Sequence, residues 1–272
     1  MKKPPRKGGH NTGRGDSARP GARRSEARRQ SSGRPSRRQP RASLELRVIY
    51  EDDAVVAVDK PAGLTAVPVE GTGMPSAFAL VAEEMKRQRQ RAYVVHRIDR
   101  FTSGVMLFAK TDRDRDALVK QFLSHTPERQ YLAVVRGRLE TNQEEMLVHY
   151  FRREGMFQRL TTAGDYQGTR AELRYSVERR LRGASLLRVT LVTGLQNQIR
   201  VQFAALGHPV IGDRKYSPEE ASERRIDRVA LHAVRLRFIH PRSGKDIFLD
   251  SKPPADFESL VKGLSLPSPP KR

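Results

Sequence analysis

Short runs of apolar or alternating residues, separated by turn residues, recur along most of this chain and predict β-strands. Val, Ile, Leu and aromatic residues dominate these runs, which favours strand over loop. The expected strands cover residues 46–50, 54–58, 93–95, 104–109, 131–135, 173–177, 186–192, 229–238 and 247–249. Helical segments do not alternate regularly with these strands, so a fold of repeated β-α-β units is not expected.

Three other segments are expected to be helices, and the first and third have apolar residues at the spacing of one helical face. The first follows Pro75, and its apolar face holds Phe78, Val81, Ala82 and Met85. The second begins at Asp112, which is expected to cap it, and runs to about residue 123. The third covers residues 198–206 and stops at Gly207. Together these elements predict a strand-rich α+β domain over residues 44–262, followed by a frayed C-terminal tail over residues 263–272.

Residues 1–43 have a different composition, made largely of Gly, Pro, Ser and Arg. Residues 1–42 hold 14 Lys and Arg against two acids, a net charge of +12. Such a segment buries too little apolar surface to offset the entropy of ordering, so a disordered basic tail is expected. Attachment to RNA is one function for it, and a solubilising tail is the other. An organellar transit peptide is also rich in Arg and Ser, so that alternative stays open.

The whole chain has 272 residues and a net charge of +21, from 52 Lys and Arg against 31 Asp and Glu. This excess favours a polyanionic partner, either a nucleic acid or an anionic membrane surface. No apolar run approaches the roughly 20 residues of a spanning helix. The absence of cysteine excludes disulfides, thiolate zinc sites and thiol nucleophiles. The histidines do not fall at metal-ligand spacing and no dinucleotide or P-loop motif is complete, so neither a metal nor a cofactor is expected.

Asp99 is the first candidate for chemistry. It lies in the stretch HRIDRFTSG, after one expected strand and before another, where a loop is held at both ends. Arg97 and Arg100 stand on either side and favour an ionised carboxylate. A carboxylate nucleophile needs that state. A loop hydrogen bond or surface ion pair would give the same local pattern, so Asp99 alone does not decide between the two.

Two further segments offer polar groups. Tyr131 opens a strand, where a tyrosine is ordinarily part of the core. Arg200 lies near the start of the third expected helix, where most arginines are simply solvated. Three amides, Gln196, Asn197 and Gln198, precede it in a turn after Gly194, an unusual density of hydrogen-bonding groups. The residues themselves therefore support a basic, nucleic-acid-binding domain without a cofactor.

Taken together, the ordered segments resemble the RluA-type family of RNA pseudouridine synthases. The likeness runs from Val48 to about Leu260. It is carried by the segments VDKPAGL (58–64), HRIDR with TSG (96–104), YLAVVRG (131–137), QIRV (198–201), LGHPVIGD (206–213), LHA (231–233) and HP (240–241). The resemblance implies a mixed, mostly antiparallel sheet with a central cleft. It also implies the isomerisation of uridine to pseudouridine in structured RNA, either rRNA or tRNA, without a cofactor.

The resemblance also assigns roles to single residues. Asp99 matches the catalytic aspartate, Tyr131 the tyrosine that stacks on the base and is a candidate proton acceptor, and Arg200 the arginine that pairs with the aspartate. We expect Arg200 to lie near Tyr131 as well and to favour its phenolate. The residues expected to contact RNA or line the base pocket are Arg97, Arg100, Ile199, Asn197 and Gln198. Whether Asp99 attacks the sugar or the base stays open.

One segment departs from the family pattern. The family usually has Gly-Arg-x-His-Gln-Ile/Leu-Arg, whereas this chain has Leu195 and Asn197 in place of the arginine and the histidine. The departure puts local RNA contacts in doubt, although Arg200 is retained. The alternative class is a non-catalytic RNA-binding protein with the same fold. Expected properties beyond the site are an RNA partner, no membrane and no obligate protein partner, hence a monomer, in the cytoplasm.

Overall fold

The structure is a computed structural model, and it describes residues 46–155, 157–219 and 223–266. The expected basic tail, residues 1–43, lies outside the described residues, as do 267–272. Within the described part the chain order is β1 Arg47–Glu51, β2 Val55–Lys60, α1 Ala77–Arg87, β3 Tyr93–Val94, β4 Ser103–Ala109, α2 Asp112–Leu123, β5 Glu128–Arg136, β6 Glu145–Glu154, β7 Phe157–Thr161, β8 Thr169–Leu181, β9 Ala184–Leu191, α3 Gln198–Ala205, β10 Leu231–Ile239, β11 Asp246–Asp250 and α4 Ala255–Leu264.

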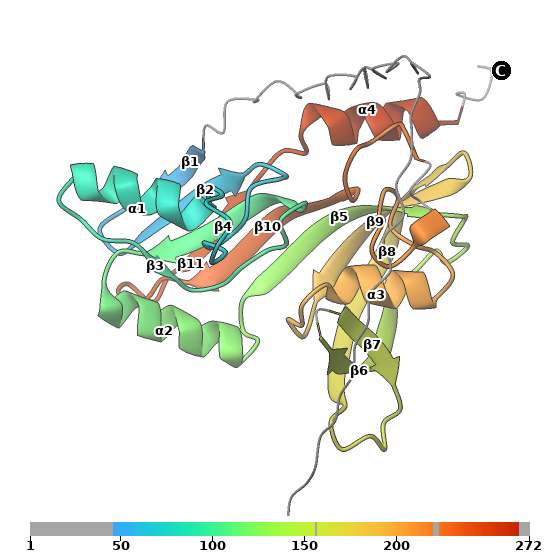
Figure 1. The fold of residues 1–272 in the computed structure, drawn as a ribbon, viewed down its shortest axis with the longest axis horizontal. Coiled ribbons are helices and arrows are strands. Elements are labelled where there is room, and N and C mark those ends of the chain that lie inside the picture. Colours follow the sequence, from blue (N-terminus) through green and yellow to red (C-terminus); the bar gives the residue numbers. More distant parts are fainter. Residues whose placement is uncertain (1–45, 156, 220–222, 267–272) are drawn as a thin grey trace, which may run out of the picture. The chain divides into compact units, whose positions relative to one another are not determined.

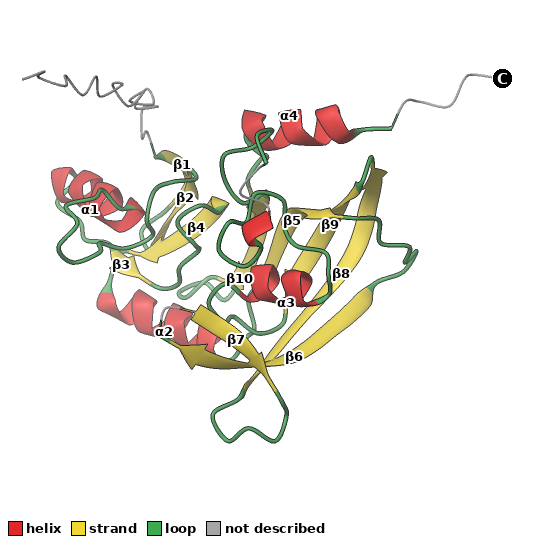
Figure 2. Cartoon of the chain, turned by 45° about the vertical axis from the view of Figure 1, so that its right-hand side comes forward, coloured by secondary structure: helices red, strands yellow, loops and turns green. Residues whose placement is uncertain are grey.

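All described strands join one mixed sheet (Figures 1 and 2). The main order is β1-β2-β4-β10-β5-β9-β8-β6-β7, while β3 pairs with β4 and β11 with β10. Every pair of these strands is antiparallel except β4 and β10, which pair in parallel at only two positions, His232 with Ser103 and Ala233 with Gly104. The predicted fold class, an α+β domain with a mixed, mostly antiparallel sheet, is therefore confirmed.

Strand β4 lies in the half of the sheet that is covered by helices on both faces, α1 on one and α2 on the other. All seven of its residues are buried. Met106 and Phe108 belong to the apolar cluster that α1 covers, whereas Val105 and Leu107 pack into the cluster that contains Leu118 of α2. Alternate side chains of a strand point to opposite faces, so β4 lies between two helices. This arrangement explains its continuous apolar sequence.

The second half of the sheet, formed by β5, β8 and β9, shares one core with α3 and α4. Phe203 of α3 meets the ring of Tyr175 on β8 edge-on, with centroids 5.3 Å apart. Helix α4 buries Phe257, Leu260 and Leu264 in the same cluster. Ile199 of α3 and Tyr131 of β5 belong to the same cluster, which brings the Arg200 and Tyr131 segments together.

Several expected boundaries differ from the structure. Thr111, not Asp112, caps α2, because its hydroxyl accepts the backbone N–H of Asp114. Strands β6 and β7 and helix α4 were not expected from the sequence. Helix α4 includes Gly263 and Leu264, two residues beyond the expected domain limit at 262. Within the described segments no helix has both the length and the apolar character to cross a bilayer.

Candidate active site

Asp99 lies in the loop between β3 and β4, and His96 holds the start of that loop. The Nε2 atom of His96 accepts the backbone N–H of Leu107 at 3.0 Å. Its ring stacks on Phe122 of α2 with centroids 4.5 Å apart. Burial lowers the pKa of His96 to about 3, so the imidazole is neutral and able to accept this bond. His96 is therefore a positioning residue for the loop.

Lys60 holds the other end of the loop. Its ammonium nitrogen is buried and donates to the backbone carbonyls of Pro61, Leu64 and Arg100, at 2.9, 2.8 and 3.1 Å. Burial lowers the pKa of Lys60 to about 7, and the nearby Asp99 carboxylate opposes that shift. One side chain thus joins the turn after β2 to the loop that carries Asp99.

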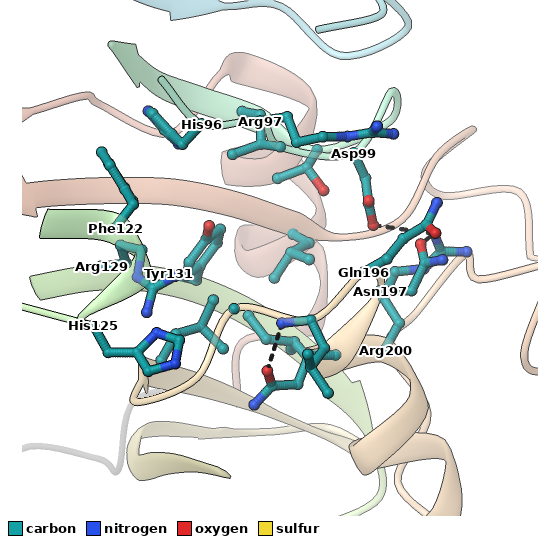
Figure 3. Close-up of a pocket in the computed structure, with 18 of the residues that line it drawn as sticks. His96, Arg97, Asp99, Phe122, His125, Arg129, Tyr131, Gln196, Asn197 and Arg200 are labelled. Carbon is teal, nitrogen blue, oxygen red and sulfur yellow. Dashed lines mark hydrogen bonds and ion pairs between the residues drawn. The ribbon is translucent and has the colours of Figure 1, made fainter. Parts of the chain in front are cut away.

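Arg200 faces Asp99 from the first turn of α3. Its Nη1 atom lies 3.3 Å from Asp99 Oδ2 and also donates to Asn197 Oδ1 at 2.6 Å. The Nε and Nη2 atoms form a two-pronged pair with the Asp213 carboxylate, each at 2.7 Å. A guanidinium fixed in this way has one orientation, because its donors lie in a rigid plane. The expected pairing of Asp99 with Arg200 is present in this geometry (Figure 3).

Asp213 is the buried centre of this network, with 1% of its surface exposed. Besides Arg200, it accepts the backbone N–H groups of Lys215 and Tyr216. The Tyr216 ring lies under the Arg200 guanidinium, 5.1 Å from ring centre to the central carbon. Asn197 Nδ2 donates to the Tyr216 hydroxyl at 3.1 Å. Arg200 is thus held from several sides, and its remaining contact is with Asp99.

Two of the three amides that precede Arg200, those of Asn197 and Gln198, form hydrogen bonds inside the protein. Asn197 has a left-handed backbone, with φ of 57°, and its side chain bonds Arg200 and Tyr216. Gln198 accepts from Thr193 Oγ1 and Leu195 N and donates to the Glu172 carbonyl. Both side chains are largely buried, yet both line the cleft described below. Their bonds position the turn and Arg200, and their contact with RNA stays a prediction.

A cleft of about 430 Å³ opens beside Asp99 (Figure 3). Its walls are the Asp99 loop, the end of α2, the start of β5 and the turn into α3. Tyr131 and Ile199 line it as the sequence predicts, and the Tyr131 hydroxyl points into it. Burial raises the pKa of Tyr131 to about 12, and the cation that opposes this shift is Arg129. Arg129 is thus the cation that favours the phenolate here, whereas the expected cation, Arg200, forms ion pairs with two carboxylates, Asp99 and Asp213.

Two polar residues of the cleft were not singled out from the sequence. The Nε atom of Arg129 and the Oγ1 atom of Thr102 are buried and have no hydrogen-bond partner among the described residues. Arg129 uses Nη2 to hold the Val192 carbonyl at 3.2 Å. It lies two residues before Tyr131 on β5, so strand alternation places both on one face. The two-residue alternation of side chains along this strand could have identified Arg129 from the sequence, as a neighbour of Tyr131 on the same face.

The side chains of Arg97 and Arg100 make different contacts. Arg97 lines the cleft beside Asp99 (Figure 3), and its side chain forms no hydrogen bond or ion pair with any described residue. Arg100 donates from Nε to the Gly63 carbonyl at 3.0 Å and lies 5.0 Å from the centre of the Phe101 ring. Over the described ranges, no group of three or more His, Cys, Asp or Glu residues is arranged to hold a metal.

The sequence is similar to known proteins over most of its length. The profile of the family described as RNA pseudouridylate synthase matches residues 54–205. Ribosomal large subunit pseudouridine synthase D of Zymomonas mobilis is 32% identical over 253 residues, 86% of this chain and 77% of that protein. The dual-specificity RNA pseudouridine synthase RluA of Vibrio cholerae is 36% identical over 208 residues, 72% of this chain and 78% of that protein.

The fold is also found in a solved structure. The chain named human RNA pseudouridylate synthase domain containing 4 superimposes with a TM-score of 0.67 at 19% identity. The match covers 82% of this chain and 95% of the human one. With the profile matching more than half of the sequence and curated relatives matching most of it, this chain belongs to the RNA pseudouridylate synthase family.

Proposed function

We propose that this protein isomerises uridine to pseudouridine within ribosomal RNA, with Asp99 as the reacting carboxylate. The observation that carries the proposal is the ion pair between Asp99 and a rigidly held Arg200 at the wall of an open cleft. The Zymomonas mobilis relative is named for the large ribosomal subunit, which supports rRNA as the substrate class. A non-catalytic RNA-binding protein would have no need to orient an arginine towards this carboxylate.

The reaction rearranges bonds without oxidation or reduction. The bond between uracil N1 and ribose C1′ breaks, the base turns, and C5 bonds to C1′. The hydrogen on C5 leaves as a proton, and N1 gains one. Asp99 can begin this sequence by attacking the sugar or the base, or by assisting departure of the base. Arg200 keeps the carboxylate aimed at the reacting atoms in each of these routes.

In this proposal the residues that line the cleft recognise the base. Tyr131 and Ile199 offer the ring and the apolar surface between which a flipped uracil can stack. Arg129 and Thr102 hold buried donors that lack partners in the described structure. Such groups cost free energy unless something satisfies them. We propose that the carbonyl oxygens of the bound uridine do so.

The target base must leave its stack to reach this cleft, which costs a few kcal/mol. Contacts between phosphates and a protein of net charge +21 offset that cost. We assign Arg97 to such contacts, since it lines the cleft without an internal partner among the described residues. We further propose that the enzyme acts as a monomer in the cytoplasm, a statement that sedimentation of the purified chain and fractionation of cells can test.

The decisive measurement is release of tritium from C5-labelled uridine in ribosomal RNA. We expect the purified protein to release tritium and Asp99→Asn to release none, because an amide cannot act as the carboxylate does. Binding of the RNA should be nearly unchanged in this variant. Asp116→Asn is the matched control, since its carboxylate is 71% exposed on α2 and outside the cleft.

Labelled transfer RNA tested beside ribosomal RNA distinguishes the substrate class. Release from transfer RNA alone would contradict the proposed rRNA substrate. Turnover by pure Asp99→Asn at the wild-type rate would remove Asp99 from its role. A wild-type protein that binds both RNAs and releases no tritium would favour the non-catalytic alternative.

A further inference from the structure

A second cavity, of about 340 Å³, adjoins the first at Asp99. The two cavities share six lining residues, Arg97, Ile98, Asp99, Gln196, Asn197 and Arg200. On the far side the second cavity is bounded by the segment after β2 and by Phe101. None of the catalytic roles proposed above uses this far side. The shared wall means that two occupants of the cavities would be immediate neighbours.

Phe101 is an exposed aromatic ring fixed in place at the edge of the second cavity. It has 45% of its surface exposed. The Arg100 guanidinium lies 5.0 Å from its ring centre and is tied through Nε to the Gly63 carbonyl. Gly63 in turn donates its backbone N–H to the Arg100 carbonyl at 2.8 Å. Gly63 has φ of +90°, a backbone conformation that favours glycine, so this double link is built into the turn.

The charge of the second cavity suits a polyanion. Its lining includes four cationic side chains, Arg97, Arg100, Arg200 and Lys215, and a single acid, Asp99. Since Arg200 is committed to Asp99 and Asp213, the excess positive charge comes from the other three. An apolar wall of Val67, Val69 and Met74 completes the cavity. Single-stranded nucleic acids are bound by this combination of an aromatic platform, arginine planes and positive charge.

We propose that the second cavity binds the nucleotide next to the target uridine in the same RNA strand, with its base stacked on Phe101. This subsite rests on the proposed function, because the target uridine must occupy the first cavity for its neighbour to reach the second. The intervening phosphate then lies along the shared wall, close to Arg97. The subsite would make the enzyme sensitive to whether the neighbouring base is free to unstack from the RNA.

The test uses two single-stranded uridine pentamers that carry 2-aminopurine next to the central uridine, one on its 5′ side and one on its 3′ side. Stacking lowers 2-aminopurine fluorescence, so the wild-type protein is expected to quench one of the two. Phe101→Ala should abolish that quenching and weaken binding roughly 5- to 150-fold, the range for one base–aromatic stack. Phe101→Trp should retain both signals.

Phe248→Ala is the matched control. Phe248 is also an exposed phenylalanine beside an arginine, Arg237, whose guanidinium lies 5.7 Å from its ring centre, but it lines neither cavity. This variant should bind and quench as the wild type does. No quenching by the wild type, or equal quenching and affinity in wild type and Phe101→Ala, overturns the subsite.

The reaction is read separately, by tritium release from labelled ribosomal RNA. Release by the wild type without any quenching that depends on Phe101 would remove the subsite and leave the proposed function intact. Quenching that depends on Phe101 without tritium release would support the subsite as an RNA site and contradict the proposed reaction.

Discussion

Asp213 is the residue on which the orientation of Arg200 depends. It supplies both acceptors of a two-pronged pair and is almost fully buried. Asp213→Asn should lower the free energy of unfolding by about 3–5 kcal/mol, because it removes one partner of a buried ion pair. The turnover number should fall while KM changes less, because the Arg200 guanidinium would keep its charge but would no longer be held in one orientation. Urea denaturation and tritium release measure the two effects.

The control for Asp213 is again Asp116→Asn. Its carboxylate pairs with Arg115 on an exposed helix surface, so the variant should be close to the wild type in both measurements. An Asp213→Asn variant as stable and as active as the wild type would show that Asn197 and Tyr216 hold Arg200 without it.

The raised pKa of Tyr131 predicts how the turnover number changes with pH if its phenolate is the base. With its pKa raised to about 12, the phenol is protonated at neutral pH, and only a small fraction is the phenolate that could take the C5 proton. If the phenolate is that base, the turnover number should rise with pH between about 7 and 9.5, because the phenolate fraction grows tenfold per unit below the pKa. Tyr131→Phe should lose this rise and be slowed ~10²–10⁴-fold.

The same pH series separates two roles for the hydroxyl. A flat profile in the wild type, together with a slow Tyr131→Phe variant, would indicate that the neutral hydroxyl orients the base by a hydrogen bond. Wild-type rates in Tyr131→Phe would leave the ring as a stacking surface only. Tritium release is the measurement in each case, because it reports loss of the C5 hydrogen directly.

Single residues of the site could be predicted unevenly from the sequence. Asp99, Tyr131 and Arg200 were noted from the residues around them and received their roles from the resemblance, and the structure brings all three to one cleft. Asp213 lies in a segment that carries the resemblance, but its partner is 13 residues away on another element, and spacing alone does not reveal such a pair. The resemblance implied that Asn197 and Gln198 contact RNA, but the sequence does not show that their amides also form hydrogen bonds inside the protein.

At the scale of elements, Gly104 lies where β4 and β10 approach each other closely. It has φ of +114°, and a Cβ placed there would lie 2.1 Å from the backbone oxygen of Ala233. Gly104→Ala should therefore separate β4 from β10 and destabilise the fold by more than about 4 kcal/mol, an exceptional cost for one methyl group. The measurement is urea denaturation, and loss of soluble folded protein counts as the same result.

Gly183→Ala separates the two causes of the cost at Gly104, which are the clash of the added Cβ with Ala233 and the strain of a positive φ. Gly183 also has a positive φ, of +65°, but a Cβ there would meet no atom within 4 Å. This variant carries only backbone strain, about 1–2 kcal/mol. Equal losses in the two variants would mean that the contact with Ala233 adjusts without cost.

The elements were predicted unevenly from the sequence. Strand β4, buried on both faces, and helix α2 were found close to their observed ends. Strand β6 was missed because its inner face includes the partly buried Leu147 and His149 and the buried Phe151, whereas Met146 and Val148 are exposed, so polarity does not alternate. Helix α4 has its buried residues at positions 257, 260, 261 and 264, the period of a helix, so its signal was present in the sequence.

At the scale of the whole molecule, charge sets the salt dependence of binding. Residues 1–42 carry +12 of the +21 total. Deleting them should weaken binding to ribosomal RNA and flatten the slope of log K against log salt, because fewer counterions are released. Deleting residues 267–272, which hold only Lys271 and Arg272 as charges, is the control and should change the slope little. An unchanged slope after the first deletion would remove the N-terminal segment from RNA binding.

During translation, β4 is synthesised long before β10, one of the strands with which it pairs. Ser103 and His232, which face each other where β4 meets β10, are 129 residues apart. At 5–20 residues per second, β10 follows β4 by roughly 6 to 26 s. During that interval β2, itself paired with β1, can already pair with β4, yet one edge of this apolar strand stays open at its first residues. A nascent chain with an open apolar edge is prone to aggregate, so yield on overexpression should depend on chaperones and on translation speed between the two strands.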